Sequence, residues 1–175
     1  MTETSKTLEI LEEALQLEVD GRQFYLDSAE RGQTTLAGNL FRTLADEELE
    51  HQKAIRTIYE KIKAGQPWPA EVRTAGPGEK IETLFSEVLQ NPEEKTEPAS
   101  TELDAVRIAL DMEDKSFRLY RDRGKQATDP AEIRFYSSLA KEEKQHYMSL
   151  IDTEEYLTDP EGWFAKKQHI SLDGA

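Results

Sequence analysis

Two sets of glutamate and histidine residues recur in this chain at a constant interval. The first set is followed 95 residues later by an identical set, so that the six residues are Glu18, Glu48, His51, Glu113, Glu143 and His146. In each half the last two residues form a Glu-x-x-His motif, whose members share one face of a helix about one turn apart. Carboxylate and imidazole groups are ligands for iron and manganese. Two halves that each offer two carboxylates and one imidazole predict a site for two metal ions.

The types of ligand also suggest how the two ions are shared. A carboxylate can bridge two cations, whereas a neutral imidazole binds one, so we assign the motif glutamates Glu48 and Glu143 as bridges. Glu18 and His51 then complete the ligand set of one ion, and Glu113 and His146 complete that of the other. Mixed oxygen and imidazole ligation favours two iron ions, with two manganese ions as the alternative, over magnesium or zinc.

The elements that carry these residues are predicted to be long helices. Apolar residues recur at spacings of three and four over residues of about 4–31, 35–64, 101–126 and 130–156, and each apolar stripe includes the suspected ligands. Period-two alternation is weak, so the fold class is all-α. Because a buried, unpaired carboxylate costs several kcal/mol, glutamates within apolar stripes are expected to meet cations rather than solvent.

The connections predict how the helices are arranged. Short turns join the helices into two hairpins, over about 4–64 and 101–157, and a crossover over 65–100 links the hairpins. One long crossover is typical of the ferritin-like four-helix bundle within a single domain, residues 1–175. The crossover is predicted to hold a short amphipathic helix over 79–90 and a solvated linker over 91–101. A short C-terminal helix is expected within 158–175, and Trp68 and Trp163 are expected to cover the ends of the bundle.

Residues beside the suspected ligands suggest supporting roles. Tyr25 and Tyr120 each follow the first glutamate of their half by seven residues, where a hydroxyl could hydrogen-bond a ligand carboxylate or serve in ordinary core packing. Gly21 and Ser116 follow the same glutamates by three residues, and either leave space for an oxidant or permit close helix packing. Other ionisable residues are predicted to have no ligand role: Glu47, Glu50 and Glu142 are interpreted as surface residues and His169 as part of the tail.

Composition excludes several classes of function. The 175 residues contain no cysteine, which excludes disulfides, thiolate zinc sites and a built-in iron–sulfur centre. The formal charge of −14 argues against nucleic-acid or anionic-membrane partners. No stretch has the roughly 20 apolar residues of a membrane span, and the first residues lack the pattern of a signal peptide, so a cytoplasmic location is expected.

Over residues of about 5–157, the two ligand sets and the long crossover resemble the rubrerythrin branch of the ferritin-like di-iron carboxylate superfamily. The resemblance implies a reduced iron pair that reacts with hydrogen peroxide or O₂. Typical rubrerythrins append a rubredoxin domain with four cysteines, which are absent here, so the resemblance implies an external electron donor such as a rubredoxin-type protein. They also carry a glutamate where Ser116 stands, so the ligand set is closer to that of bacterioferritin.

The expected activity is therefore peroxide or O₂ reduction coupled to oxidation of ferrous iron. The alternatives are a ferroxidase or iron-storage protein, a dimanganese catalase, and a non-catalytic helical bundle. A homodimer is expected, and the long crossover would permit exchange of helical hairpins between protomers.

Overall fold

The computed structural model describes residues 3–31, 35–72, 74, 79–90 and 100–172 of the chain. Six helices occupy the described residues: α1 (Glu3–Arg31), α2 (Thr35–Lys63), α3 (Glu79–Gln90), α4 (Ser100–Gln126), α5 (Pro130–Thr158) and α6 (Pro160–Leu172). This all-α arrangement confirms the predicted fold class. None of these helices is long and apolar enough to cross a membrane.

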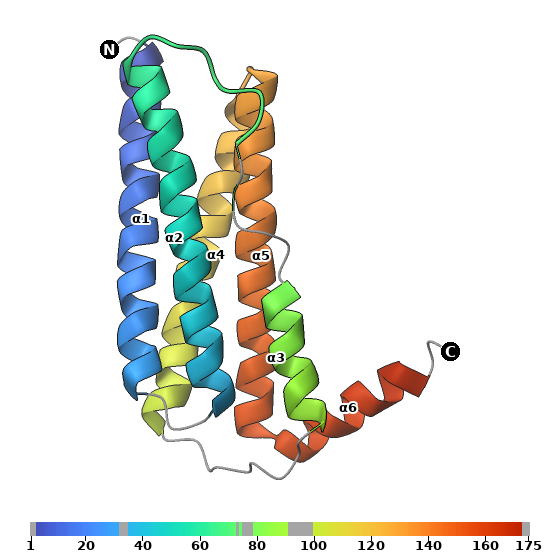
Figure 1. Ribbon diagram of the computed structural model, residues 1–175. Helices are drawn as coiled ribbons and strands as arrows, with labels where there is room; N and C mark the ends of the chain where they lie inside the picture. The colour runs from blue at the N-terminus through green and yellow to red at the C-terminus, as the bar shows by residue number, and fades with distance from the viewer. Residues whose placement is uncertain (1–2, 32–34, 73, 75–78, 91–99, 173–175) are drawn as a thin grey trace.

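Two helical hairpins form the body of the bundle (Figure 1). Helix α1 packs along α2, and α4 packs along α5, while α1 meets α4 and α2 meets α5 across the bundle. The described residues 65–72 of the crossover pass from the end of α2 toward α5, and α3 packs against α2 and is seen along the C-terminal half of α5 (Figure 1). Helix α6 turns away from the bundle axis after α5. Part of the predicted linker, residues 91–99, lies outside the described residues.

Local sequence signals fix the ends of the helices that carry the motifs. Asp129 caps α5 by accepting hydrogen bonds from the backbone N–H groups of Ala131 (2.7 Å) and Glu132 (3.4 Å), and Pro130 supplies the first helical residue. Helix α2 ends at Lys63, and two residues later Gly65 has a φ of 73°, in the left-handed region that favours glycine after a helix. These signals fix where the helices begin and end, while burial of the apolar stripes turns the motifs toward the core.

Two apolar clusters lie on either side of a polar layer in the bundle. The first includes Leu40, Phe41, Leu44, Val106 and Leu150, and the second includes Leu11, Ile55, Ile58, Tyr136 and Leu139. Each fully buried aliphatic side chain contributes roughly 1.5–3 kcal/mol to folding through removal of apolar surface from water. The clusters exclude water from the layer between them, which contains the six suspected ligands.

The two tryptophans pack at different places along α5. Trp68 lies in the crossover and contacts Phe135 and Tyr136 near the start of α5, with ring centroids 5.9 Å from each. Trp163 lies within α6 and packs against Tyr156 near the end of α5, at 5.3 Å between centroids. Trp163 is therefore part of the short C-terminal helix that the sequence predicts within residues 158–175.

Candidate metal centre

The structure brings all six predicted residues into one buried layer. Each of the four long helices contributes its suspected ligands to this layer, and all six side chains are at most 3% exposed: Glu18, Glu48, His51, Glu113, Glu143 and His146. Because the glutamates occur at core-facing positions of long amphipathic helices, packing of the apolar clusters forces their carboxylates together. The result is a concentration of four carboxyl groups and two imidazoles inside the protein.

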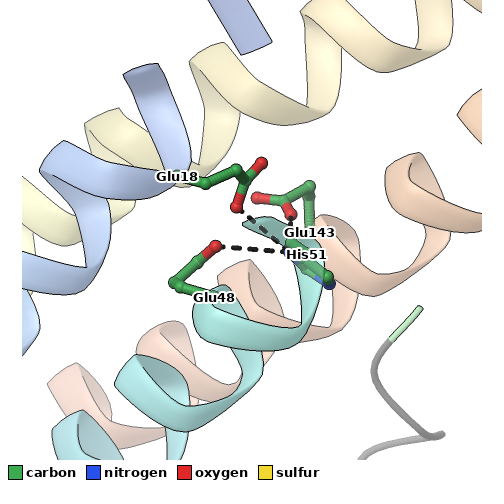
Figure 2. Close-up of side chains that lie close together, drawn as sticks. All are labelled: Glu18, Glu48, His51 and Glu143. Atoms are coloured by element: carbon green, nitrogen blue, oxygen red, sulfur yellow. Dashed lines mark hydrogen bonds and ion pairs between the residues drawn. The ribbon is translucent and has the colours of Figure 1, made fainter. Parts of the chain in front are cut away.

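One half of the layer is centred on the Nδ1 atom of His51 (Figure 2). This nitrogen lies 3.2 Å from Glu18 Oε2, 3.2 Å from Glu48 Oε2 and 3.1 Å from Glu143 Oε1. Figure 2 shows the three carboxylates approaching the imidazole from α1, α2 and α5. One ligand atom from each of these four residues lies within 4.8 Å of the others, so the group could hold one cation.

The second half repeats this arrangement with the partners exchanged. The Nδ1 atom of His146 lies 3.5 Å from Glu113 Oε2 and 3.6 Å from Glu48 Oε1. Glu48, Glu113, Glu143 and His146 form a second group whose ligand atoms lie within 4.8 Å of one another. Both groups contain Glu48 and Glu143, the two residues that the sequence analysis assigned as bridges. The rings of His51 and His146 are parallel to within 21°, with centroids 5.7 Å apart.

The hydrogen bonds within the layer are incomplete in the way that a metal site requires. Glu113 Oε2 and His146 Nδ1 lie 3.5 Å apart and have no hydrogen-bond partner among the described residues, and Glu143 Oε1 has only its 3.1 Å contact with His51 Nδ1. A buried polar atom without a partner costs roughly 1–3 kcal/mol, and more if it is charged. All three atoms are at positions where a cation would bind them. The residues present therefore fit a dinuclear metal site, with oxygen and nitrogen donors suited to iron or manganese.

The electrostatics of the metal-free layer also point to a missing positive charge. Burial and the nearby Glu48 carboxylate raise the pKa of Glu18 to about 8, against an opposing effect of His51. Burial followed by the charges of Glu113, Glu18 and Glu48 raises the pKa of Glu143 above its usual value. Burial would raise the pKa of Glu48 as well, but hydrogen bonds with Glu18 and both histidines hold it below the usual range. Protons thus occupy part of the layer, and two divalent cations would displace them.

The histidines respond to the same surroundings in the opposite sense. Burial alone would lower the pKa of His51, but the charge of Glu18 and several hydrogen bonds raise it well above the usual value. The pKa of His146 is raised against burial in the same way, chiefly by Glu113. Neutral imidazole is the form that binds metal, so binding at either histidine must also release a proton.

Each outer histidine nitrogen faces a glutamate of the opposite hairpin. His51 Nε2 lies 3.0 Å from Glu142 Oε2, and His146 Nε2 lies 2.8 Å from Glu47 Oε2. Glu47 and Glu142 are 8% and 6% exposed, so their interpretation as surface residues was wrong. Although they lie off the centre of the apolar stripe, they flank the α2–α5 contact and become buried there. A carboxylate on the outer nitrogen fixes the imidazole orientation and leaves Nδ1 free to bind a metal.

The sequence contains a signal for this missed pair. Glu47 and Glu142 obey the same 95-residue interval as the ligands and precede each histidine by four residues. The two carboxylates differ in their further hydrogen bonds, because Glu142 Oε1 also accepts from the hydroxyls of Ser138 (3.2 Å) and Thr74. Thr74 belongs to the crossover, and no sequence pattern indicated that it would reach this site. Glu50, by contrast, is exposed as expected and pairs with Lys53.

The two tyrosines connect the hairpins on the other side of the layer. The hydroxyl of Tyr25 on α1 donates to Glu113 Oε1 on α4, and that of Tyr120 on α4 donates to Glu18 Oε1 on α1. Both tyrosines are at most 1% exposed. Burial and then the charge of the bonded glutamate raise both tyrosine pKa values well above 10, so the phenols remain donors at neutral pH. The sequence left open whether these tyrosines bond a ligand carboxylate or serve only in core packing, and the structure shows the hydrogen bonds to the carboxylates.

The remaining predicted positions are placed more simply. Gly21 is buried on α1, and a Cβ atom added there would lie 3.9 Å from both Glu48 Cδ and Met112 Cε, which is ordinary contact. Ser116 is partly buried on α4. The side chain of His169 lies outside the described residues.

The fold and the site together define a class of protein: a ferritin-like helical bundle whose buried carboxylate and histidine residues fit two metal ions. Comparison with known families agrees, because the chain matches the family model described as Rubrerythrin over residues 9–153. This match covers most of the chain, and the protein belongs to the rubrerythrin family. No curated protein and no solved structure matches the chain significantly.

Proposed function

We propose that the protein is a di-iron oxidoreductase that reduces hydrogen peroxide and takes its electrons from a separate donor protein. The observation that carries this proposal is the pair of overlapping ligand groups that share Glu48 and Glu143. Membership of the rubrerythrin family supports iron and redox chemistry. When bound, a reduced iron pair supplies one electron from each ion and stabilises negative charge on the departing oxygen.

The protein's own residues would prepare this chemistry in three ways. Glu48 and Glu143 would hold the two ions at a fixed separation, since each carboxylate reaches both ligand groups. Glu47 and Glu142 would keep the imidazoles oriented, because each contacts an outer histidine nitrogen. The apolar clusters on both sides would exclude water, which strengthens every charge interaction in the layer.

Proton handling would also fall to residues of the layer. Reduction of peroxide to two water molecules consumes two protons together with two electrons. The phenol of Tyr120 already donates to Glu18 and could pass a proton along that hydrogen bond. These contacts offer a local supply of protons within a dry site.

A ferroxidase is the second candidate, and one observation favours it. Ser116 stands where typical rubrerythrins carry a further glutamate, and the observed arrangement of four glutamates and two histidines is symmetric between the halves. A symmetric site does not offer either ion an additional carboxylate on α4. This feature favours iron oxidation with O₂ in an iron-handling protein.

Stopped-flow oxidation of the ferrous-loaded protein separates the two candidates. Anaerobically loaded protein is mixed with equal concentrations of peroxide or O₂, and the ferric absorbance is followed. The proposal predicts faster oxidation by peroxide, with iron that remains bound and can be reduced again. Faster oxidation by O₂ with accumulation of ferric product would favour the ferroxidase. Parallel loading with manganese and measurement of O₂ release from peroxide tests the dimanganese catalase alternative.

The oligomeric state and location follow from the same proposal. We propose a homodimer in the cytoplasm, in which the electron donor reaches each protomer by diffusion. Gel filtration distinguishes this dimer from the cage that an iron-storage protein would form.

A further inference from the structure

A continuous row of aromatic rings leads from the candidate metal centre to the outside of the bundle. Tyr120, whose hydroxyl donates to Glu18, stacks on Tyr136 with ring centroids 6.3 Å apart and an interplanar angle of 21°. Tyr136 in turn contacts Trp68, at 5.9 Å between centroids. Trp68 is only partly buried, whereas Tyr120 and Tyr136 are at most 1% exposed. The row therefore joins a ligand carboxylate to a solvent-accessible indole.

The other half of the repeat offers a comparison within the same chain. Tyr25 is the counterpart of Tyr120 and makes the equivalent hydrogen bond, to Glu113. Its stacked neighbour is Phe41, the counterpart of Tyr136, at 5.9 Å between centroids. No tryptophan ring contacts Phe41 in the part of the chain that the structure describes. The row of that half continues from Tyr25 to the partly buried Phe24, at 5.8 Å between centroids. Core packing is thus satisfied without an indole, and among the described residues only the row that begins at Tyr120 ends at an indole ring, which is more readily oxidised than a phenyl ring.

We propose that Trp68, Tyr136 and Tyr120 form a route for single oxidising equivalents between the metal centre and the surface. The inference rests on the proposed reaction with peroxide, which requires two electrons and two protons to become two water molecules. A metal pair that is only partly reduced would supply one of these electrons, and Tyr120 would supply the second. Its phenolic proton moves along the existing hydrogen bond to Glu18, leaving a neutral tyrosyl radical.

The radical then leaves the core by electron transfer from Trp68. Tyr120 regains an electron from the indole and its proton from Glu18, and the oxidised indole loses its N–H proton to solvent. A small one-electron reductant in solution, such as ascorbate, restores Trp68 by returning one electron and one proton. The route protects the ligand layer, because an oxidising equivalent held among buried side chains would otherwise damage them.

The hydroxyl groups assign different roles to the two tyrosines. Tyr120 has an acceptor for its proton, namely Glu18, so it can hold a neutral radical. The buried hydroxyl of Tyr136 has no hydrogen-bond partner among the described residues, so its oxidation would leave a positive charge in the core. Tyr136 therefore acts through its ring as a bridge, while Tyr120 and Trp68 are the two ends of the route.

Pulse radiolysis of the metal-free protein tests the route without relying on the metal reaction. Azide radicals oxidise accessible indole rings, which here means Trp68, because Trp163 is fully buried. At pH 9, where Glu18 is ionised and can accept the phenolic proton, we expect first-order decay of the tryptophanyl radical with matching growth of a tyrosyl radical, because the same rings carry the electron in either direction. This transfer should be lost in Tyr120→Phe and in Tyr136→Leu, and retained in the matched control Tyr25→Phe. Circular dichroism of each variant checks that the bundle is intact.

Two outcomes of that experiment overturn the route. Equal transfer in Tyr120→Phe and Tyr25→Phe would show that Tyr120 is not the internal end. Transfer at an unchanged rate in folded Tyr136→Leu would show that the bridge is elsewhere. Because no metal is present, neither result depends on whether the protein reduces peroxide.

A second measurement uses the loaded protein. Protein containing fewer ferrous ions than ligand groups is treated with peroxide without a reductant, and oxidised residues are located by mass spectrometry. The route predicts oxidation at Trp68 and little at Trp163, with protection by ascorbate. Equal oxidation of the two tryptophans would contradict the route. Failure of peroxide to oxidise the iron would instead count against the proposed function alone.

Discussion

Removal of one tyrosine hydroxyl tests whether the contacts between the hairpins depend on ionised carboxylates. Tyr120 donates to Glu18 in a fully buried position, and the pKa of Glu18 is about 8 in the metal-free protein. Below that pH the bond joins two neutral groups and is worth about 0.5–1.5 kcal/mol, whereas a bond to the ionised carboxylate is worth about 1.5–3 kcal/mol. Tyr120→Phe should therefore be more destabilising at pH 9 than at pH 6.

The expected effect can be measured as a melting temperature. For a chain of this length, 1 kcal/mol corresponds to about 2–4 °C. Tyr120→Phe should thus lower the Tm of the metal-free protein by roughly 1–6 °C at pH 6 and by roughly 3–12 °C at pH 9. Differential scanning calorimetry of the metal-free variant and wild type at both pH values gives these shifts.

Tyr136→Phe is the matched control for this substitution. Tyr136 is as buried as Tyr120, but within the described part of the chain its hydroxyl has no hydrogen-bond partner. Removal of this hydroxyl should therefore leave stability unchanged or slightly increased. Equal losses of stability in the two variants would refute the reasoning, because the hydrogen bond to Glu18 would then not be the cause. A loss in Tyr120→Phe that does not grow with pH would refute the raised pKa of Glu18.

Four further predictions concern the ligand layer and the helix residue beside it. Glu142→Gln should weaken metal binding by roughly 10- to 100-fold in equilibrium dialysis, because it alters the contact that orients the His51 imidazole. The control Glu50→Gln changes an exposed residue and should leave the affinity unchanged. Similar affinities in the two variants would show that Glu142 does not orient His51 for metal binding. Metal affinity should fall by about tenfold per pH unit for each displaced proton as the pH drops below about 8, because Glu18 then retains its proton. Calorimetry of metal binding in two buffers of different ionisation enthalpy should show proton release. Binding heats that do not depend on the buffer would contradict this proton release. The same group makes the metal-free fold lose stability as the pH rises from about 4.5 through about 8, since the unfolded carboxyl ionises first. Gly21→Ala should stabilise the metal-free protein by about 0.4–1 kcal/mol in chemical denaturation, because the added methyl meets only ordinary contacts; destabilisation would mean that the helix needs glycine there.

Much of the fold followed from the sequence because the apolar stripes are long and regular. Leu40, Leu44, Ile55 and Ile58 repeat at helical spacing through the second motif, so both the helix and its buried face were predictable. The length of the crossover then determined the ferritin-like connection of the two hairpins. The end of a helix such as α2 was also predictable, because glycine follows the last apolar residue.

The contacts around the ligands were less predictable, because they depend on how the hairpins face each other. Periodicity assigns a residue to a stripe or to solvent, but Glu47 and Glu142 lie between these, on the flanks that meet when α2 packs against α5. Thr74 reaches Glu142 only because the crossover runs along α5. Such contacts between distant segments leave no local pattern, although the internal repeat does mark the glutamate pair.

The central claim is that the six buried residues hold two metal ions at a shared site. The most direct measurement is metal analysis after anaerobic loading with ferrous iron and removal of free metal, combined with X-ray absorption. If the six residues form this site, the wild-type chain should hold two ions at a separation of roughly 3.5–4 Å. The double variant Glu48→Gln, Glu143→Gln should lose both ions, because both ligand groups share these glutamates. Fewer than two ions per wild-type chain, or two ions retained by the double variant, would contradict it.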